Sequence, residues 1–526
     1  MKPKRVHGTS ERSGSEKQSG PSLSVCLITR DEADRVRVAL DSVREVAAEV
    51  VVVDTGSTDD TVEIAASSGA RVIESPWNND FSHSRNAGLD VALGDWILCL
   101  DADERLAPNQ GRRLRRLMTA PADAYFVRIR SPQAGRLGEQ TFVHAFPRLF
   151  RNRPDFRFQR RVHEQIHPSL EAAGARIRHS DLDIEHDGYA VDHAARRLKL
   201  ERNLMLLQMD LEERPGDGFV LYHLGETYAL LEDPATARTF YRRALEIEEL
   251  PPEYRASALQ NLASALLSLN DLDPAIEAAR DALRWNRNAL TSYLILGSAE
   301  CRKGECRKAI GMVDRYLKAC DDPARRTNPS LMGFEPDRAR AYLIRGESSL
   351  RSGRLRDAEA DADRLLKIAP EHAAGRRLMA RIALTRGSSD AARTHLQRAV
   401  DLDPDHAASW RDLALLQAKE GDVDGALTTM NAAIHRQKQA ILYDCQGLLR
   451  IKAGDFPGAA DSYRRLLKLE PTCAEAHRRL AGLYQKMGDS DRARAHLANV
   501  GRTEGRNGVP MSASSRHFPE QGAAGD

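Results

Sequence analysis

Apolar residues in the first third of the chain fall in short runs that alternate with amphipathic stretches. The runs are typical of strands buried on both faces of a parallel sheet, and the stretches between them have apolar residues at helical spacing. The expected strands are residues 23–29, 50–53, 71–73 and 96–100, and the expected helices are residues 32–46, 58–68 and 82–93. Two of these helices close at Gly69 and Gly94. Alternation with short links predicts a mostly parallel, doubly wound α/β sheet, followed by a strand-rich region after about residue 124.

From about residue 216 the pattern changes to a repeat of about 34 residues. Each unit has a small residue in its first helix and an alanine twelve positions later, where two paired helices must approach closely. The small residues are Gly225, Ala263, Gly297, Gly346, Ala380, Ala414, Gly447 and Ala481. One longer step holds residues 321–337, which we expect to form an inserted loop. The pattern resembles the tetratricopeptide repeat and predicts an all-α solenoid of about eight repeats over residues 216–502.

Composition and charge argue against some functional classes of protein. The 526 residues include 78 Lys plus Arg and 76 Asp plus Glu, and this balance argues against a dedicated nucleic-acid binder. Seven scattered cysteines without a Cys-x-x-Cys pair suit a reducing compartment. No apolar run is long enough to span a membrane. We therefore expect the protein in the cytoplasm, free or at the inner face of the membrane, with disordered ends at residues 1–20 and 503–526.

The sharpest local motif is Val-Val-Val-Asp54-Thr-Gly-Ser-Thr, at the end of the second expected strand. An Asp-Thr-Gly loop also occurs in aspartic proteases, but their chemistry needs two such aspartates that share a proton. The sequence has no second Asp-Thr-Gly or Asp-Ser-Gly, and the motif runs into a helix. An aspartate that ends a parallel strand instead lies at the crevice where open α/β sheets bind ligands. Asp54 could there accept hydrogen bonds from a nucleoside base, and Gly56 permits the sharp turn beside it.

A second motif, Asp101-Ala-Asp103, follows the fourth expected strand. Carboxylate oxygens at this place can hold Mg²⁺ or Mn²⁺, which prefer hard oxygen ligands and commonly bridge to phosphates. Asp-x-Asp alone occurs by chance in many chains. Its position after a buried strand, downstream of the Asp54 strand, makes it a strong signal.

Four ordered segments together resemble the family-2 glycosyltransferases, in particular the lipooligosaccharide glucosyltransferase branch and its repeat-bearing relatives. They are residues 24–32, 51–59, 84–88 and 100–105, and the similarity extends over roughly residues 22–215. The resemblance implies a GT-A (Rossmann-like) fold, a nucleotide-sugar donor that is usually uridine-linked, Mg²⁺ or Mn²⁺, and inversion at the anomeric carbon.

The resemblance also implies a role for each residue of the site. The donor-binding residues are Thr29, Glu32, Asp54, Gly56, Ser57, Arg85 and Asp101. The metal ligand is Asp103, and His186 lies where many GT-A enzymes place a C-terminal histidine against the metal or diphosphate. A later family segment supplies the acidic base that takes the acceptor's proton. Glu164 is the residue we assign, with His163 as its competitor.

The expected organisation is a GT-A domain over residues 21–190, a connecting helix over residues 191–215, and the repeat array. The acceptor would be a saccharide, a lipid-linked molecule or a protein, and the repeats would recognise this acceptor or a partner protein without creating the active site. The alternative is an interaction scaffold with a decayed transferase domain. Survival of the complete motif set favours the enzyme.

Overall fold

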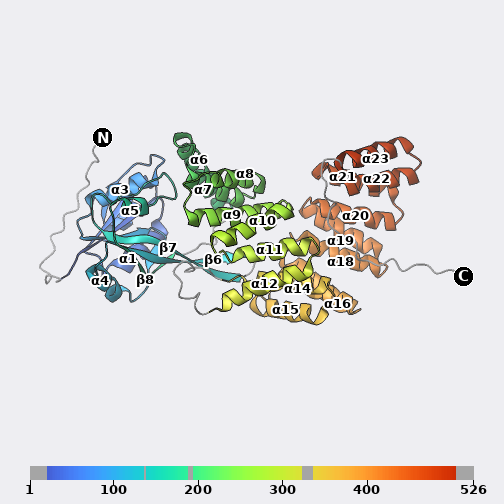
Figure 1. The fold of residues 1–526 in the computed structure, drawn as a ribbon, viewed down its shortest axis with the longest axis horizontal. Coiled ribbons are helices and arrows are strands. Elements are labelled where there is room, and N and C mark those ends of the chain that lie inside the picture. Colours follow the sequence, from blue (N-terminus) through green and yellow to red (C-terminus); the bar gives the residue numbers. More distant parts are fainter. Residues whose placement is uncertain (1–19, 136–137, 187–192, 323–335, 505–526) are drawn as a thin grey trace. The chain divides into compact units, whose positions relative to one another are not determined.

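The computed structural model of the chain describes residues 20–135, 138–186, 193–322 and 336–504 (Figure 1). The two ends that we expect to be disordered lie outside these ranges, except for Gly20 and residues 503–504. The chain consists of two compact units, Met1–Ile295 with Lys318–Pro336 and Leu296–Leu317 with Asp337–Asp526. The α/β domain and the first repeats therefore belong to the same unit.

The α/β domain is built on one eight-stranded sheet with the order β3-β2-β1-β4-β7-β6-β8-β5. The strands are β1 (Leu23–Thr29), β2 (Glu49–Asp54), β3 (Arg71–Glu74), β4 (Trp96–Asp101), β5 (Glu104–Leu106), β6 (Ala124–Gly135), β7 (Gly138–Arg151) and β8 (Ile177–His186). Strands β1 to β4 are parallel, as predicted. The strand-rich second half is mixed: β7 runs antiparallel to both β4 and β6, β5 runs antiparallel to β8, and β6 runs parallel to β8.

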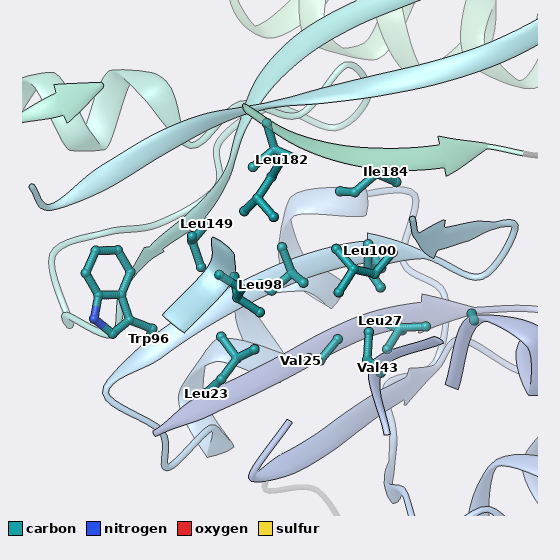
Figure 2. Packing of buried hydrophobic residues seen from close by; sticks show 14 of the residues in the cluster. Leu23, Val25, Leu27, Val43, Trp96, Leu98, Leu100, Leu149, Leu182 and Ile184 are labelled. Atoms are coloured by element: carbon teal, nitrogen blue, oxygen red, sulfur yellow. The ribbon is translucent and has the colours of Figure 1, made fainter. Parts of the chain in front are cut away.

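Strands β1, β2 and β4 are buried on both faces over most of their length, which explains their continuous apolar runs. The helices of the domain are α1 (Ala33–Val43), α2 (Thr61–Ser67), α3 (Phe81–Val91), α4 (Gly111–Thr119) and α5 (His167–Ala172). Leu23, Val25 and Leu27 of β1 pack with α1 and with Leu98 of β4 in one cluster (Figure 2). The intervening Cys26 packs on the other face, in a cluster that includes residues of α3.

After β8 the chain is helical throughout its described part, beginning with α6 (His193–Glu213), which lies inside the expected connecting segment. The repeats in the first unit include α7 (Gly218–Leu230), α8 (Pro234–Leu245), α9 (Pro252–Ser268) and α10 (Leu272–Trp285), and α11 (Thr291–Arg302) and α12 (Cys306–Asp321) follow. The second unit continues with α14 (Arg338–Arg351), α15 (Leu355–Ile368), α16 (Ala373–Thr385), α17 (Ser389–Leu402), α18 (Ala407–Lys419), α19 (Val423–Arg436), α20 (Ala440–Lys452), α21 (Phe456–Leu469), α22 (Ala474–Lys486) and α23 (Ser490–Glu504). The predicted α/β domain followed by an all-α repeat solenoid is confirmed.

The close packing of paired helices at the small residues can be tested by a substitution at Gly225. A Cβ atom on Gly225 of α7 would lie 2.6 Å from the ring of Tyr241 on α8. We expect Gly225→Ala to destabilise the first unit by about 1–3 kcal/mol, because the buried ring cannot move aside without repacking. Thermal and urea unfolding measure this. Gly482→Ala is the matched control, since Gly482 lies in α22 with no atom within 4 Å of the added Cβ, and we expect it to stabilise by about 0.5–1 kcal/mol. Equal effects of the two substitutions would contradict the packing argument.

Candidate active site

Three strands of the sheet end at the same level and present polar side chains there. Thr29 at the end of β1 pairs with Asp54 at the end of β2, and Ile28 pairs with Asp101 at the end of β4. The carboxyl edge of the parallel strands therefore gathers Thr29, Asp54 and Asp101, as the sequence pattern requires. Open α/β sheets bind their ligands at this edge.

Asp54 shapes the loop that follows β2. Its carboxylate accepts hydrogen bonds from the backbone N–H groups of Gly56 and Ser57, both at 3.0 Å, and from the Ser57 hydroxyl at 2.5 Å. Gly56 has a φ of 110°, which side chains disfavour. These hydrogen bonds fix the orientation of the Asp54 carboxylate. A nucleoside base that bound there would share the carboxylate oxygens with the donors of Gly56 and Ser57.

Asp31, which the sequence interpretation did not single out, joins the loops after β1 and β2. Its carboxylate accepts from the backbone N–H of Thr58 at 2.7 Å, and its own N–H donates to Ser57 Oγ at 3.0 Å. The adjacent Glu32 pairs with Arg35 at 2.8 Å, and burial raises the pKa of Glu32. The two loops therefore form one rigid wall of the site.

Arg85 of α3 lies at the centre of the site. Its Nε donates to Glu164 Oε1 and its Nη2 donates to Asp101 Oδ1, both at 2.6 Å. The side chain is only 6% exposed. Burial alone would lower the pKa of Arg85, but the charges of Asp101 and Glu164 hold it well above its usual value. The structure thereby brings together three residues that the sequence interpretation placed in one site from distant segments.

Glu104 and Arg148 complete this charged cluster, although they carried no assigned role. Arg148 Nη2 of β7 lies 3.1 Å from Asp101 Oδ2 and 3.2 Å from Glu104 Oε1. The backbone N–H of Asp101 also donates to Glu104 Oε2 at 2.8 Å. Burial raises the pKa of Glu104 to about 7, whereas Arg85 and Arg148 hold the pKa of Asp101 below its usual range despite burial. Glu104 falls inside the segment 100–105 that resembles the family, but its pairing with Arg148 could not be predicted from the sequence.

Asp103 and His186, the two expected metal ligands, lie side by side. His186 Nε2 is 3.1 Å from Asp103 Oδ2, and its Nδ1 is 2.9 Å from Ser131 Oγ. The hydrogen bond to Asp103 raises the pKa of His186. In the part of the chain that the structure describes, no group of three or more His, Cys, Asp and Glu side chains forms a metal site. One carboxylate and one imidazole suit a cation that takes its other ligands from a diphosphate and water.

Glu164 and His163 are neighbours in sequence but point to different partners. The Glu164 carboxylate contacts Arg85, and its side chain is 14% exposed. The His163 ring stacks on His223 of α7, with ring centroids 4.1 Å apart. Desolvation lowers the pKa of His163 well below its usual value, so the ring is neutral near pH 7. Of the two candidate bases, Glu164 is the one held within the charged cluster.

This fold and site define a class of protein, an α/β transferase domain joined to helical repeats. Residues 24–184 match the model of Glycosyl transferase family 2, and residues 216–285, 322–373, 377–441 and 450–507 match models of the tetratricopeptide repeat. The chain therefore contains a glycosyltransferase domain of family 2 followed by tetratricopeptide repeats, as the motifs indicated.

The curated relatives include both a repeat-containing protein and glycosyltransferases. The chain is 35% identical over 269 residues to a TPR repeat-containing protein of Synechococcus elongatus and 25% identical over 244 residues to the SPbeta prophage-derived glycosyltransferase SunS of Bacillus subtilis. It is also 44% identical over 85 residues to an uncharacterized glycosyltransferase of Rickettsia felis. These matches cover 50%, 44% and 16% of this chain, and 66%, 55% and 30% of the relatives, less than two thirds of each.

Among the helices that the structure describes, none is both long and apolar enough to cross a membrane.

Proposed function

We propose that this protein is an inverting, metal-dependent glycosyltransferase of the cytoplasm that moves a sugar from a UDP-linked donor to a saccharide, lipid-linked or protein acceptor. The observation that carries the proposal is the Arg85 cluster. One buried guanidinium holds both Asp101, at the expected sugar or ribose position, and Glu164, the expected base. A decayed domain would have no reason to keep every member of this charged arrangement.

Two unsatisfied atoms support a bound donor at this edge of the sheet. Thr29 Oγ1 and Arg85 Nη1 are buried and have no hydrogen-bond partner among the described residues. Buried polar atoms in proteins are almost always hydrogen-bonded, so each isolated one calls for an explanation. Hydroxyl or phosphate oxygens of a nucleotide sugar would satisfy both.

The proposed reaction is a single in-line displacement at the anomeric carbon. The acceptor oxygen forms a bond to that carbon while its proton passes to the Glu164 carboxylate. The bond from the carbon to the donor phosphate breaks, and the nucleoside diphosphate leaves with the electron pair. Arg85 binds Glu164 through Oε1, so Oε2 is the atom that would take the proton.

Asp103 and His186 are the residues that would hold the divalent cation. A bound Mg²⁺ or Mn²⁺ would offset the charge that develops on the leaving diphosphate. Asp103 and His186 fit this role because Asp103 Oδ2 and His186 Nε2 lie close together, at hydrogen-bond distance, so that one cation could bind both atoms.

UDP binding is expected to depend on Mn²⁺ and on Asp103, because Asp103 would hold a cation that offsets the charge of the diphosphate. Calorimetry with UDP should show binding with Mn²⁺ that is weakened at least tenfold in EDTA and in Asp103→Ala. Asp181→Ala is a suitable control, since this carboxylate pairs with Arg113 on the distant α4. The metal proposal fails if Asp103→Ala binds UDP as the wild type does.

Transfer itself is tested by incubating the full chain with a panel of nucleotide sugars and Mn²⁺ and following release of the nucleoside diphosphate. We expect slow hydrolysis of one or a few uridine-linked donors. A protein that binds no nucleotide and hydrolyses none would instead be an interaction scaffold.

A further inference from the structure

The segment that carries Glu164, residues 159–166, is held on one side by the α/β domain. Gln159 and Gln165 form an isolated antiparallel bridge, each N–H donating to the other's carbonyl at 3.0 Å. The Arg161 carbonyl accepts from the backbone N–H of Phe81, at the start of α3, at 2.9 Å. The bridge closes the segment on itself, whereas the Phe81 bond and the contact between Arg85 and Glu164 attach the segment to α3.

The other side of the same segment is held by α6 and the first repeat. Arg160 Nη1 lies 2.7 Å from Asp217, immediately before α7, and its guanidinium lies over the Phe219 ring at 4.1 Å. Arg161 Nε lies 3.3 Å from Asp210 of α6.

Two further contacts extend this attachment to α7 and α9. The His163 ring stacks on His223 of α7, as described above. Gln165 Nε2 donates to the Tyr254 hydroxyl of α9 at 2.9 Å. Three helices outside the family-2 match thus contact a segment within it.

Two further observations, an apolar contact and two unusual φ values, indicate that the contacts with the helices determine the backbone conformation of this segment. Val162 is 4% exposed and packs in a cluster with Leu206 and Leu207 of α6 and with residues of α7. Arg160 and His163 have φ values of 84° and 52°, in the left-handed region that costs free energy for residues with a side chain. Such a path persists only where the surroundings impose it. Here the side chains of residues 160–163 and 165 face the helices, while Glu164 alone turns back to Arg85.

We propose that α6 and the first two repeats are part of the transferase site. They impose the backbone path that places Glu164 on Arg85, so Asp217, His223 and Tyr254 are positioning residues for sugar transfer. This inference rests on the proposed function, because it assumes that Glu164 is the base. It also revises the expectation that the repeats serve recognition without creating the active site.

The test uses the full chain with Asp217→Asn and Tyr254→Phe combined. Asp217 also accepts hydrogen bonds from the N–H groups of Phe219 and Val220, and asparagine caps helices as well as aspartate, so the substitution removes the charge but keeps the cap. Tyr254→Phe removes only the hydroxyl that Gln165 contacts. Misplacement of a reacting group by about 1 Å can cost about 100-fold in rate, so we expect kcat to fall about 10- to 100-fold. The donor KM and UDP affinity should stay within about twofold, because the loops after β1 and β2 are untouched.

Asp233→Asn is the matched control. Asp233 caps α8 in the same repeat as Asp217 by accepting from the N–H of Thr236 at 3.0 Å, and among the described residues no hydrogen bond or ion pair joins it to residues 159–166. It should leave kcat and the melting temperature unchanged. A merely structural role of the first repeat would lower the melting temperature or raise KM without the selective loss of kcat.

Hydrogen exchange supplies a readout that does not depend on activity. The amides of Gln159 and Gln165 should exchange at least tenfold faster in the double variant than in the wild type or in Asp233→Asn. Unchanged kcat in the double variant overturns the inference, whether or not these amides exchange faster. If the wild type transfers from no nucleotide sugar, the proposed function fails, and unchanged exchange would then also refute the attachment of the segment to the repeat.

Discussion

Replacing Glu164 with glutamine is expected to lower the rate of sugar transfer by about 10²- to 10⁴-fold while leaving donor binding intact. A general base contributes this much by removing the acceptor's proton in the transition state. Glutamine has nearly the same shape and its carbonyl oxygen can still accept from Arg85 Nε, so the cluster should persist. Single-turnover transfer measures the rate, and calorimetry with UDP and Mn²⁺ measures donor binding.

Two further variants decide how this result is interpreted. Glu185→Gln removes a carboxylate of β8 that pairs with Arg105 at 2.9 Å, outside the Arg85 cluster, and should transfer at close to the wild-type rate. His163→Ala tests the competing base. An active Glu164→Gln together with an inactive His163→Ala would show that the neighbouring histidine, despite its stacking on His223, takes the proton.

Arg85→Met is expected to cause the largest loss of stability among single substitutions in the site. It leaves the carboxylates of Asp101 and Glu164 partly buried without their shared cation, and breaking a buried ion pair in this way costs about 3–5 kcal/mol. Urea and thermal unfolding of the first unit measure the change. Transfer activity should be lost as well, because Glu164 then lacks the contact that holds it.

The same substitution at an exposed arginine serves as the control. Arg153 pairs with Asp155 at 2.6 Å, but both side chains are more than 40% exposed, so Arg153→Met should not change the melting temperature measurably. The double variant Arg85→Met/Glu164→Gln should be more stable than Arg85→Met, because one unpaired charge is removed. If the double variant is the less stable of the two, the loss does not arise from an unpaired Glu164 carboxylate.

The local sequence pattern and the register of parallel strands were enough to predict the part of the site that lies at the ends of the strands. Continuous apolar runs identified β1, β2 and β4, and strands that are parallel and in register bring Thr29, Asp54 and Asp101 to one edge. The period of the repeats likewise predicted paired helices in close contact, and Gly225 against Tyr241 shows the physical reason.

The rest depends on pairings between distant segments that no local pattern encodes. Arg148 reaches Asp101 and Glu104 only because β7 returns antiparallel beside β4, and the pattern gave no sign of that strand order. The contact of Val162 with Leu206 and Leu207 is of the same kind. Apolar residues indicate that a surface will be buried but not which surface will cover it.

The attachment of residues 159–166 to the first two repeats has a consequence for how the protein is made. Gln165 and its partner Tyr254 are separated by 89 residues, which take roughly 4–18 s to synthesise at 5–20 residues per second. During that time the nascent transferase domain exposes Val162 and its strained loop without the helices that cover them. The catalytic domain therefore completes its fold only after the start of the second repeat has been synthesised, and chaperones that bind apolar segments have this interval in which to act.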